Sequence, residues 1–361
     1  MLTAVTRGHT LALAAVFLAA APSASRALET GPLPYQLGQG LSFPAQQLNI
    51  GGYLNVRYSD LEGSPWQFGL HDLSLFISKT LPRRWQFFSE VELGDALQLS
   101  TNGLSGSDSE VDLERLYADY RATPALTIRF GKYLTPVGRW NQIHADPLVW
   151  TPDRPVTSAA PFARHASGAM IYGDVPLAGQ SLDYSLYLDD SELIDPLQKR
   201  ELAFEDSTAA ASPRNAFKRA AGARLAWHFD ADAAALGVSY LRMQMTDLRE
   251  RKELFGADAI WTVRRMEFSG EWVYRNSLGR AEGDEHGWFV QAVLPLPARF
   301  YFIARHERYH AAALSRTAVL DDLGVTWRPH PAVSVKLEHR DGRHNQVIAP
   351  SGWLGSLAVL F

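Results

Sequence analysis

Residues 333–340 have the sequence VSVKLEHR. Val333, Val335 and Leu337 alternate with four polar side chains, three of them charged. Successive side chains of a β-strand point to opposite faces, so this pattern predicts a strand with one apolar and one polar face. The segment 266–275, MEFSGEWVYR, repeats the pattern with aromatic side chains on its apolar face. Strands of this kind need an apolar environment on one side and a polar environment on the other.

The same alternation recurs along most of the chain, whereas helical signals are nearly absent. The alanine-rich stretches 209–211 and 231–235 lie beside turns and lack an apolar stripe at helical spacing. We therefore expect an all-β protein with sixteen strands. The predicted strands are 48–59, 68–80, 85–99, 111–121, 125–132, 167–174, 180–189, 219–229, 233–246, 254–263, 265–275, 286–294, 299–309, 317–328, 332–340 and 352–361.

The connections between these segments alternate between short and long. LPRR (81–84) and PHP (329–331) are short, whereas 100–110 and 190–218 are long and polar. Because every backbone N–H and C=O must be paired in lipid, only a helix or a closed barrel can span a membrane. Short turns at one end and long loops at the other are typical of outer-membrane barrels. The sequence therefore predicts a 16-stranded antiparallel transmembrane β-barrel over 48–361, with short periplasmic turns, long external loops and an open lumen.

The N-terminal residues predict export. Residues 1–27 contain Arg7, an apolar run from Leu11 to Ala21 and small residues near the end, which is the pattern of a secretory signal peptide. Residues 28–47 are rich in Pro, Gly and Gln, and we expect them to form a short N-terminal extension. The chain has no cysteine, so disulfides do not hold it. Its formal net charge of −4 does not favour nucleic acid as a partner.

The stretch between the fifth and sixth predicted strands has no regular period. Its residues 133–165 include five prolines among tryptophan, phenylalanine and aliphatic side chains. A loop longer than about 15 residues is usually functional or disordered, and this composition is too apolar for disorder. We expect the stretch to fold into the lumen as the pore constriction; an external cap is the alternative. The expected constriction residues are Arg139, Trp140, Asn141, His144, Asp146, Asp153, Arg154 and Arg164.

Charged residues on the polar faces of the strands are expected to line the lumen. Rings of Arg and Lys favour anions, whereas rings of Asp and Glu favour cations, and here both signs occur. Between residues 132 and 165 there are four basic and two acidic residues, which weakly favours anions. The expected lumen cations are Arg57, Arg115, Arg121, Arg129, Arg224, Arg265, Arg305, Lys336 and Arg340, and the expected lumen acids include Glu90, Glu92, Asp119, Glu267, Glu271, Glu307 and Glu338.

The last predicted strand alternates up to Phe361 and resembles the signal that bacterial outer-membrane barrels present to their assembly machinery. The stretch 131–150, GKYLTPVGRWNQIHADPLVW, with LYADYR (116–121) upstream, resembles porins of the phosphate-selective O/P type and their general relatives. The resemblance implies a passive diffusion channel for small hydrophilic solutes or ions in the outer membrane of a Gram-negative bacterium. It also implies contact with outer-membrane lipid, lipopolysaccharide and the barrel assembly machinery, and it allows a homotrimer.

Two other kinds of function stay open from the sequence. A channel for hydrophobic substrates would use a short N-terminal hatch, and a barrel could also act as a surface enzyme or a structural anchor. His144 and Asp146 are too few ligands for a metal site. The motifs GxxxxGK[ST], HExxH and GxSxG do not occur. His306 and His339 are expected to face outward with no serine placed beside them. We therefore expect no enzyme activity, no cofactor and no metal.

Overall fold

The structure, a computed structural model, divides the chain into two units, residues 1–34 and Tyr35–Phe361. The described residues all belong to the second unit, so the predicted signal peptide and residues 28–34 of the predicted extension lie outside them. The structure describes residues 35–361 apart from 107–108, 144, 196–200, 203–213, 230–232, 247–250, 279–282, 312–315 and 346–347.

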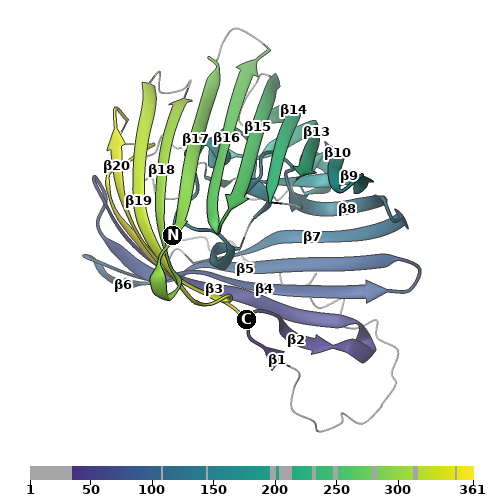
Figure 1. The fold of residues 1–361 in the computed structure, drawn as a ribbon, viewed down its shortest axis with the longest axis horizontal. Helices are drawn as coiled ribbons and strands as arrows, with labels where there is room; N and C mark the ends of the chain where they lie inside the picture. The colour runs from purple at the N-terminus through teal and green to yellow at the C-terminus, as the bar shows by residue number, and fades with distance from the viewer. Residues whose placement is uncertain are drawn as a thin grey trace, which may run out of the picture. The chain divides into compact units, whose positions relative to one another are not determined.

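The second unit is a closed antiparallel barrel of sixteen strands (Figure 1). Each strand pairs with the next along the chain, and the last pairs with the first, with Leu354 opposite Ser59. Each predicted segment coincides with one barrel strand, and differences are confined to the strand ends. Within the described residues, no helix is long and apolar enough to cross a membrane. The barrel strands are β3 (Leu48–Leu61), β4 (Gln67–Leu81), β5 (Trp85–Ser100), β7 (Glu110–Thr123), β8 (Leu126–Leu134), β9 (His165–Leu177), β10 (Gln180–Asp189), β13 (Phe217–Phe229), β14 (Ala234–Met245), β15 (Arg251–Val263), β16 (Met266–Ser277), β17 (Glu285–Pro295), β18 (Phe300–Ala311), β19 (Arg316–His330), β20 (Val333–Arg343) and β21 (Gly352–Leu360).

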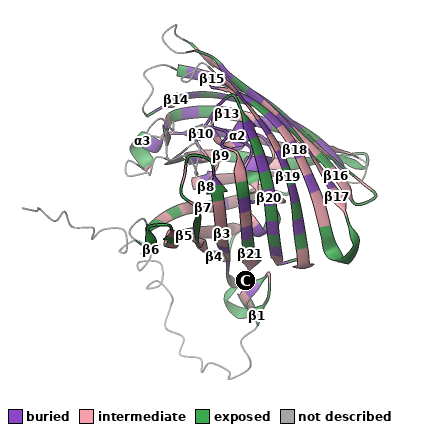
Figure 2. Ribbon diagram, turned by 90° about the vertical axis from the view of Figure 1, so that its left-hand side faces the viewer, coloured by how far each residue is buried: buried purple, intermediate pink, exposed green. Residues whose placement is uncertain are grey.

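The barrel carries polar side chains on its inner face and apolar side chains on its outer face. Along β20, Lys336, Glu338 and Arg340 are each at most 3% exposed, whereas Val335 and Leu337 are 38% and 52% exposed. Figure 2 shows the resulting alternation of buried and exposed residues along the strands. A soluble protein buries its apolar side chains and exposes its charged ones. Burying an unpaired charge costs far more free energy than exposing a leucine. The predicted assignment of the two faces is confirmed for this strand.

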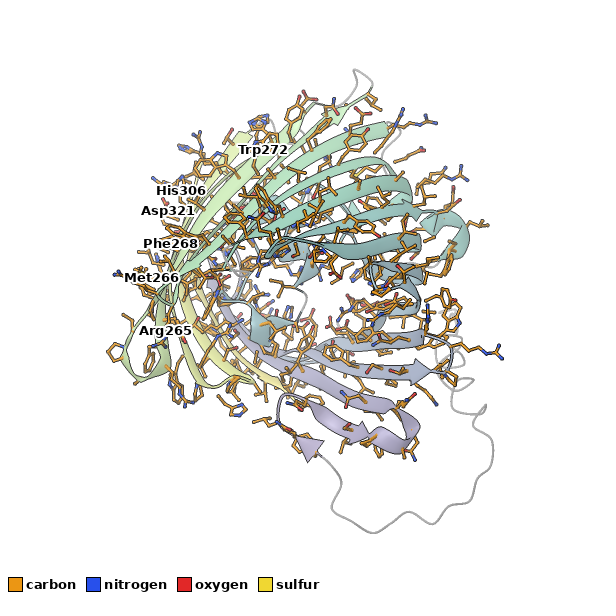
Figure 3. All side chains as sticks on the ribbon, turned by 45° about the vertical axis from the view of Figure 1, so that its right-hand side comes forward. Arg265, Met266, Phe268, Trp272, His306 and Asp321 are labelled. Carbon is orange, nitrogen blue, oxygen red and sulfur yellow. The ribbon has the colours of Figure 1, made fainter. Side chains whose placement is uncertain are left out.

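The outer face of β16 is lined by Met266, Phe268 and Trp272 (Figure 3). Directly before this strand, Arg264 and Arg265 form a tight turn in which both residues have a positive φ, 49° and 70°. The prediction that Arg265 lines the lumen from a strand is therefore wrong. The strand begins one residue later than the predicted segment 265–275, because the turn takes both arginines.

Short turns join the strands at one end of the barrel, and mostly longer connections join them at the other. The first end, which we call the turn end, includes the connections 82–84 and 264–265. The second end, which we call the loop end, includes 135–164 and 190–216. Short connections suffice between antiparallel neighbours, so the long ones are free to serve other roles. The predicted alternation of short and long connections is confirmed.

The described part of the predicted N-terminal extension forms a small hairpin at the turn end. β1 (Tyr35–Gln36) pairs with β2 (Gly40–Phe43), and β2 pairs with residues 48–50 of β3. Beside it, Phe361 and Gly52 exchange two backbone hydrogen bonds of 2.8 Å each, which extends the seam between β21 and β3. The hairpin and the C-terminal residue therefore lie next to each other along β3.

Candidate functional site

The connection between β8 and β9, residues 135–164, is the candidate site, and we call it the lumen segment. It contains the short helices η2 (Trp140–Gln142), η3 (Asp146–Leu148) and α2 (Val156–Ala159). Proline is the second residue of η3 and directly precedes α2, positions where a backbone N–H has no partner within the helix. Most of its described residues are buried, so this connection is packed rather than displayed in solvent.

The two ends of the lumen segment are fastened to each other. The Thr135 N–H donates to the Arg164 carbonyl at 2.8 Å, and the Thr135 hydroxyl donates to the Ala163 carbonyl at 2.7 Å. The Asn141 amide donates to the carbonyls of Thr135 and Arg164, at 2.8 and 3.1 Å. Asn141 is 1% exposed. This predicted constriction residue therefore fixes the shape of the segment from within.

Glu271 on β16 holds the first turn of the lumen segment. Its Oε1 accepts hydrogen bonds from the backbone N–H groups of Trp140 and Arg139, at 2.5 and 2.7 Å. The Gly138 N–H donates to the Ser239 hydroxyl on β14 at 3.3 Å. Gly138 has a φ of +62°, and a Cβ at this position would lie 2.4 Å from Glu271 Oε2. Only glycine combines this backbone conformation with so close an approach to the carboxylate.

Glu307 on β18 holds the start of α2. Its Oε1 accepts hydrogen bonds from the Thr157 N–H at 2.6 Å and from the Thr157 hydroxyl at 2.8 Å. These bonds satisfy a backbone donor that has no partner inside the helix. Nearby, Arg275 on β16 donates to the Pro161 carbonyl at 2.9 Å and pairs with Glu285 at 2.6 Å. Barrel side chains therefore fix both ends of the α2 region.

An ion-pair network holds the middle of the lumen segment. Asp153 lies 2.6 Å from Arg340 on β20 and 3.6 Å from Arg57 on β3. Arg340 also lies 3.3 Å from Asp322, which pairs with Arg305 at 2.5 Å. The Arg305 and Asp322 side chains are at most 1% exposed. Charges buried this deeply are tolerated only when they are paired, so the network couples the position of Asp153 to the barrel wall.

Further polar contacts join the same stretch to β20 and β3. Lys336 Nζ donates to the carbonyls of Asp146 and Thr151, at 2.7 and 3.2 Å. The Asn55 amide donates to the Asp146 carboxylate. The lumen segment leaves the wall between β8 and β9, yet its partners lie on β14, β16, β18, β20 and β3. In a closed ring of sixteen strands these partners include the wall opposite its attachment, so the segment crosses the barrel interior.

The remaining predicted constriction residues fall into different environments. Trp140 is buried, whereas Arg139, Arg154 and Arg164 are partly exposed. His144 lies outside the described residues.

Most predicted lumen cations sit on the inner face and are paired with acids across neighbouring strands. The guanidinium of Arg129 donates to both carboxylate oxygens of Asp119 at 2.8 Å each, and Arg115 Nε donates to Glu90. Arg121 lies near the turn end of β7 and is exposed. The predicted cations on the inner face are Arg57, Arg115, Arg129, Arg224, Arg305, Lys336 and Arg340.

The alternation of polar and apolar side chains in the sequence does not identify every residue that holds the lumen segment in place. It places Glu271 and Glu307 on the inner face but does not indicate that they accept hydrogen bonds from loop backbone. Asp322 is absent from the expected lumen residues although it joins Arg305 to Arg340. Asp321 and Asp322 are adjacent in sequence, so a count of polar residues alone does not say which of them faces inward.

The outer face carries a His–Asp pair of chemical interest. His306 Nδ1 on β18 and Asp321 Oδ1 on β19 lie 2.5 Å apart (Figure 3). A hydrolase of the serine type would add a nucleophilic hydroxyl to such a pair. The hydrogen bonds of the described residues bring no serine to His306. Across the same residues, no cluster of three or more His, Cys, Asp or Glu side chains is arranged to hold a metal ion.

Comparison by sequence gives little information on family. No protein-family model matches the chain. An uncharacterized protein of Aquifex aeolicus (strain VF5) is 31% identical over 159 residues, which cover 43% of this chain. The matched region covers 33% of that protein, so the chain spans about a third of the length of this relative.

Comparison by structure identifies the architecture. The anion-selective porin from Comamonas acidovorans matches 87% of this chain and 98% of its own, with a TM-score of 0.56 and 13% identity. The trimer form of OmpT, an outer membrane protein of Vibrio cholerae, matches 87% and 99%, with a TM-score of 0.58 and 12% identity. Salmonella typhi OmpF, in complex with daunomycin, matches 89% and 99%, with a TM-score of 0.58 and 9% identity. The chain therefore has the fold of the outer-membrane porins.

Proposed function

We propose that this protein is a porin, a passive diffusion channel for small hydrophilic solutes. The observation that carries the proposal is the distribution of side chains on the barrel. The inner face is charged, and the outer face exposes large apolar side chains. An Arg or Lys facing lipid at the bilayer midplane costs about 2–4 kcal/mol, so the inner charges require water and the outer face suits hydrocarbon. Transport by such a channel depends on size and electric field and involves no covalent step.

The barrel spans the outer membrane of a Gram-negative bacterium, with its turn end in the periplasm and its loop end outside the cell. The lumen segment narrows the passage. The barrel assembly machinery inserts the chain by recognising Phe361, and outer-membrane lipid and lipopolysaccharide surround the outer face. Three copies associate as a homotrimer, a proposal supported by the trimeric form in which one structural neighbour was solved.

The channel prefers anions weakly. The lumen segment contains three arginines, Arg139, Arg154 and Arg164, and two acidic residues, Asp146 and Asp153. A positive charge near a narrow passage attracts anions, and low-dielectric walls strengthen its field. Glu90 and other carboxylates on the inner face of β5 oppose this effect, so the preference stays small. Phosphate is the first anion to compare with chloride, because residues 131–150 resemble the phosphate-selective porins.

The test is single-channel recording of the purified protein in a planar bilayer. Stepwise ohmic conductance in KCl, with a small reversal potential of anion-selective sign under a salt gradient, is the expected result. Membrane insertion without conductance would overturn the proposal and favour a structural anchor or a surface enzyme. Conductance that appears only when a hydrophobic solute is added would favour the hydrophobic-substrate transporter.

A further inference from the structure

A row of aromatic and arginine side chains lies on the inner face of five neighbouring strands, β4, β5, β7, β8 and β9. Its members share the face of Ser74 and Asp119, which are buried polar residues of the barrel interior. The wall opposite these strands carries the anchors Glu271 and Glu307 of the lumen segment. We call these side chains the aromatic–arginine row: Phe76, Phe88, Arg115, Tyr117, Arg129 and Tyr172.

The row is a continuous stack at its β4–β7 end. The Arg115 guanidinium carbon lies 4.6 Å from the centre of the Phe88 ring and 5.8 Å from that of Phe76. Phe88 and Tyr117 face each other across β5 and β7, with ring centres 5.3 Å apart and planes inclined by 21°. Cations over aromatic faces are attracted by the ring quadrupole, so each contact helps to hold the arginine beside the rings.

The stack continues on β8 and β9. The Arg129 guanidinium carbon lies 3.6 Å from the centre of the Tyr117 ring and 4.9 Å from that of Tyr172. The Tyr172 hydroxyl donates a hydrogen bond to Asp119 at 2.8 Å, and Asp119 also accepts a hydrogen bond from Arg129. Each arginine is thus fixed by one carboxylate and by aromatic rings, which leaves little rotamer freedom to lose when a solute arrives.

The arginines still have donors to offer. The Arg115 side chain is 18% exposed and that of Arg129 is 17% exposed. A guanidinium has five N–H donors, and Arg115 uses its Nε for Glu90. In the part of the chain that the structure describes, the terminal nitrogens of Arg115 have no hydrogen-bond acceptor. They are therefore available to an oxygen-bearing solute in the lumen.

We propose that the aromatic–arginine row is a binding track for small planar aromatic carboxylates. The inference rests on the proposed channel function and names the class of solute that the channel favours. The solute ring stacks on the aromatic and guanidinium faces of the row, and its carboxylate accepts hydrogen bonds from an arginine edge. An aliphatic acid makes only the second contact, and an uncharged aromatic compound makes only the first.

The track is long enough to pass a solute along. Adjacent strands lie about 4.8 Å apart, so the row extends over about 20 Å of wall. Barrel strands are tilted, so a row perpendicular to them also advances along the pore axis. Arg115 and Arg129 then act as successive weak sites, which is what conduction requires of a channel that binds its solute.

The experiment uses the full chain in planar bilayers and measures how added solutes reduce the KCl current. The probes are benzoate, cyclohexanecarboxylate and benzamide. Benzoate and cyclohexanecarboxylate share charge and approximate size but differ in ring aromaticity, and benzamide keeps the ring without the charge. We expect half-maximal reduction by benzoate at a concentration about fivefold lower than by either of the other two, from the usual strength of one aromatic stack.

The variant Phe88→Leu with Tyr117→Leu removes the central stack and keeps both arginines. In this variant, benzoate and cyclohexanecarboxylate should reduce the KCl current at the same concentration. The matched control is Phe130→Leu on β8, which removes a ring that is 51% exposed on the outer face and should leave the advantage intact. Both variants must form KCl-conducting channels, which shows that they fold.

The outcomes separate this inference from the proposed function. A parent protein that never conducts KCl overturns the channel itself. If the parent protein conducts KCl but benzoate and cyclohexanecarboxylate block it at the same concentration, the proposed track is wrong and the proposed channel function is unaffected. Equal potency of benzamide and benzoate overturns the role of the arginines, and a benzoate advantage that survives in the double variant shows that the binding lies elsewhere.

Discussion

The Arg340 guanidinium lies 2.6 Å from the Asp153 carboxylate, although the two residues are 187 positions apart in the sequence. Arg340 belongs to a regular strand, whereas Asp153 belongs to a loop with no periodic pattern. The contact is one of several by which buried barrel charges determine the path of the lumen segment. It also makes the stability of the barrel and the position of the lumen segment depend on the same side chains.

Replacing Arg340 with methionine should destabilise the barrel by up to about 3 kcal/mol, because the buried Asp322 and the partly exposed Asp153 each lose one of two arginine partners. The measurement is the urea concentration at the midpoint of unfolding of the detergent-solubilised protein. The folded fraction is monitored by its heat-modifiable migration on a gel. Arg343→Met is the control, since this side chain is 48% exposed and its pairs are worth at most about 1 kcal/mol. Equal losses in the two variants would show that the network does not stabilise the fold.

The variants Glu271→Ala and Glu271→Gln should differ although both remove the charge. Alanine leaves the N–H groups of Arg139 and Trp140 without an acceptor, at a cost of about 1–3 kcal/mol each. Glutamine keeps a carbonyl oxygen that can accept them. We expect increased open-channel current noise in the alanine variant and near-parental noise in the glutamine variant. Quiet channels in the alanine variant would contradict the role of Glu271 as an anchor.

Replacing Arg139 and Arg154 together with serine should shift the reversal potential toward cations. Charges near a narrow passage act through a low dielectric, whereas charges at the loop end are screened by water. The control replaces Lys218 and Arg219, which are 37% and 64% exposed on β13, and should change little.

The shift produced by the arginine variants should shrink as salt rises, because the Debye length falls from about 10 Å at 0.1 M to about 3 Å at 1 M. If the two double variants give the same reversal potential as the parent, the lumen segment does not govern ion preference.

Phe361→Asp should reduce the amount of protein in the outer membrane and increase the amount degraded in the periplasm. The substitution keeps the two backbone bonds to Gly52 but places a charge where the aromatic ring packs against that glycine. Phe361→Tyr keeps the ring and should assemble almost normally. Cell fractionation with immunoblotting measures both variants. Normal outer-membrane levels of the aspartate variant would show that Phe361 is not an assembly signal.

The strands could be predicted because one physical pattern is repeated sixteen times. Water inside and an apolar surround outside impose a period of two on every strand, and proline or polar residues mark most connections. The errors occur where turn chemistry departs from the usual residues. Tight hairpin turns favour Asn-Gly, yet Arg264 and Arg265 take the positive φ values here, as do Arg83 and Arg84. Because the usual signal is missing, the sequence pattern extends the predicted strand to include Arg265.

The candidate site could be predicted only in outline. The length, prolines and apolar residues of 133–165 distinguish it from the other connections, and they suffice to single it out. Its contacts depend on partners as distant in sequence as Glu271, Glu307 and Lys336, and no local pattern encodes that pairing. The sequence predicts Trp140 and Asn141 as constriction residues, and the structure shows that both are buried.

The seam between β3 and β21 imposes an order on assembly. β3 is the first barrel strand to leave the ribosome and β21 is the last, so the ring cannot be sealed before synthesis of the barrel is complete. Until then the sheet has two unpaired edges, which can join other chains and aggregate. The lumen segment must also wait for β14 to β20 before its anchors exist. The lumen segment therefore gains its anchors only after most of the barrel has been synthesised.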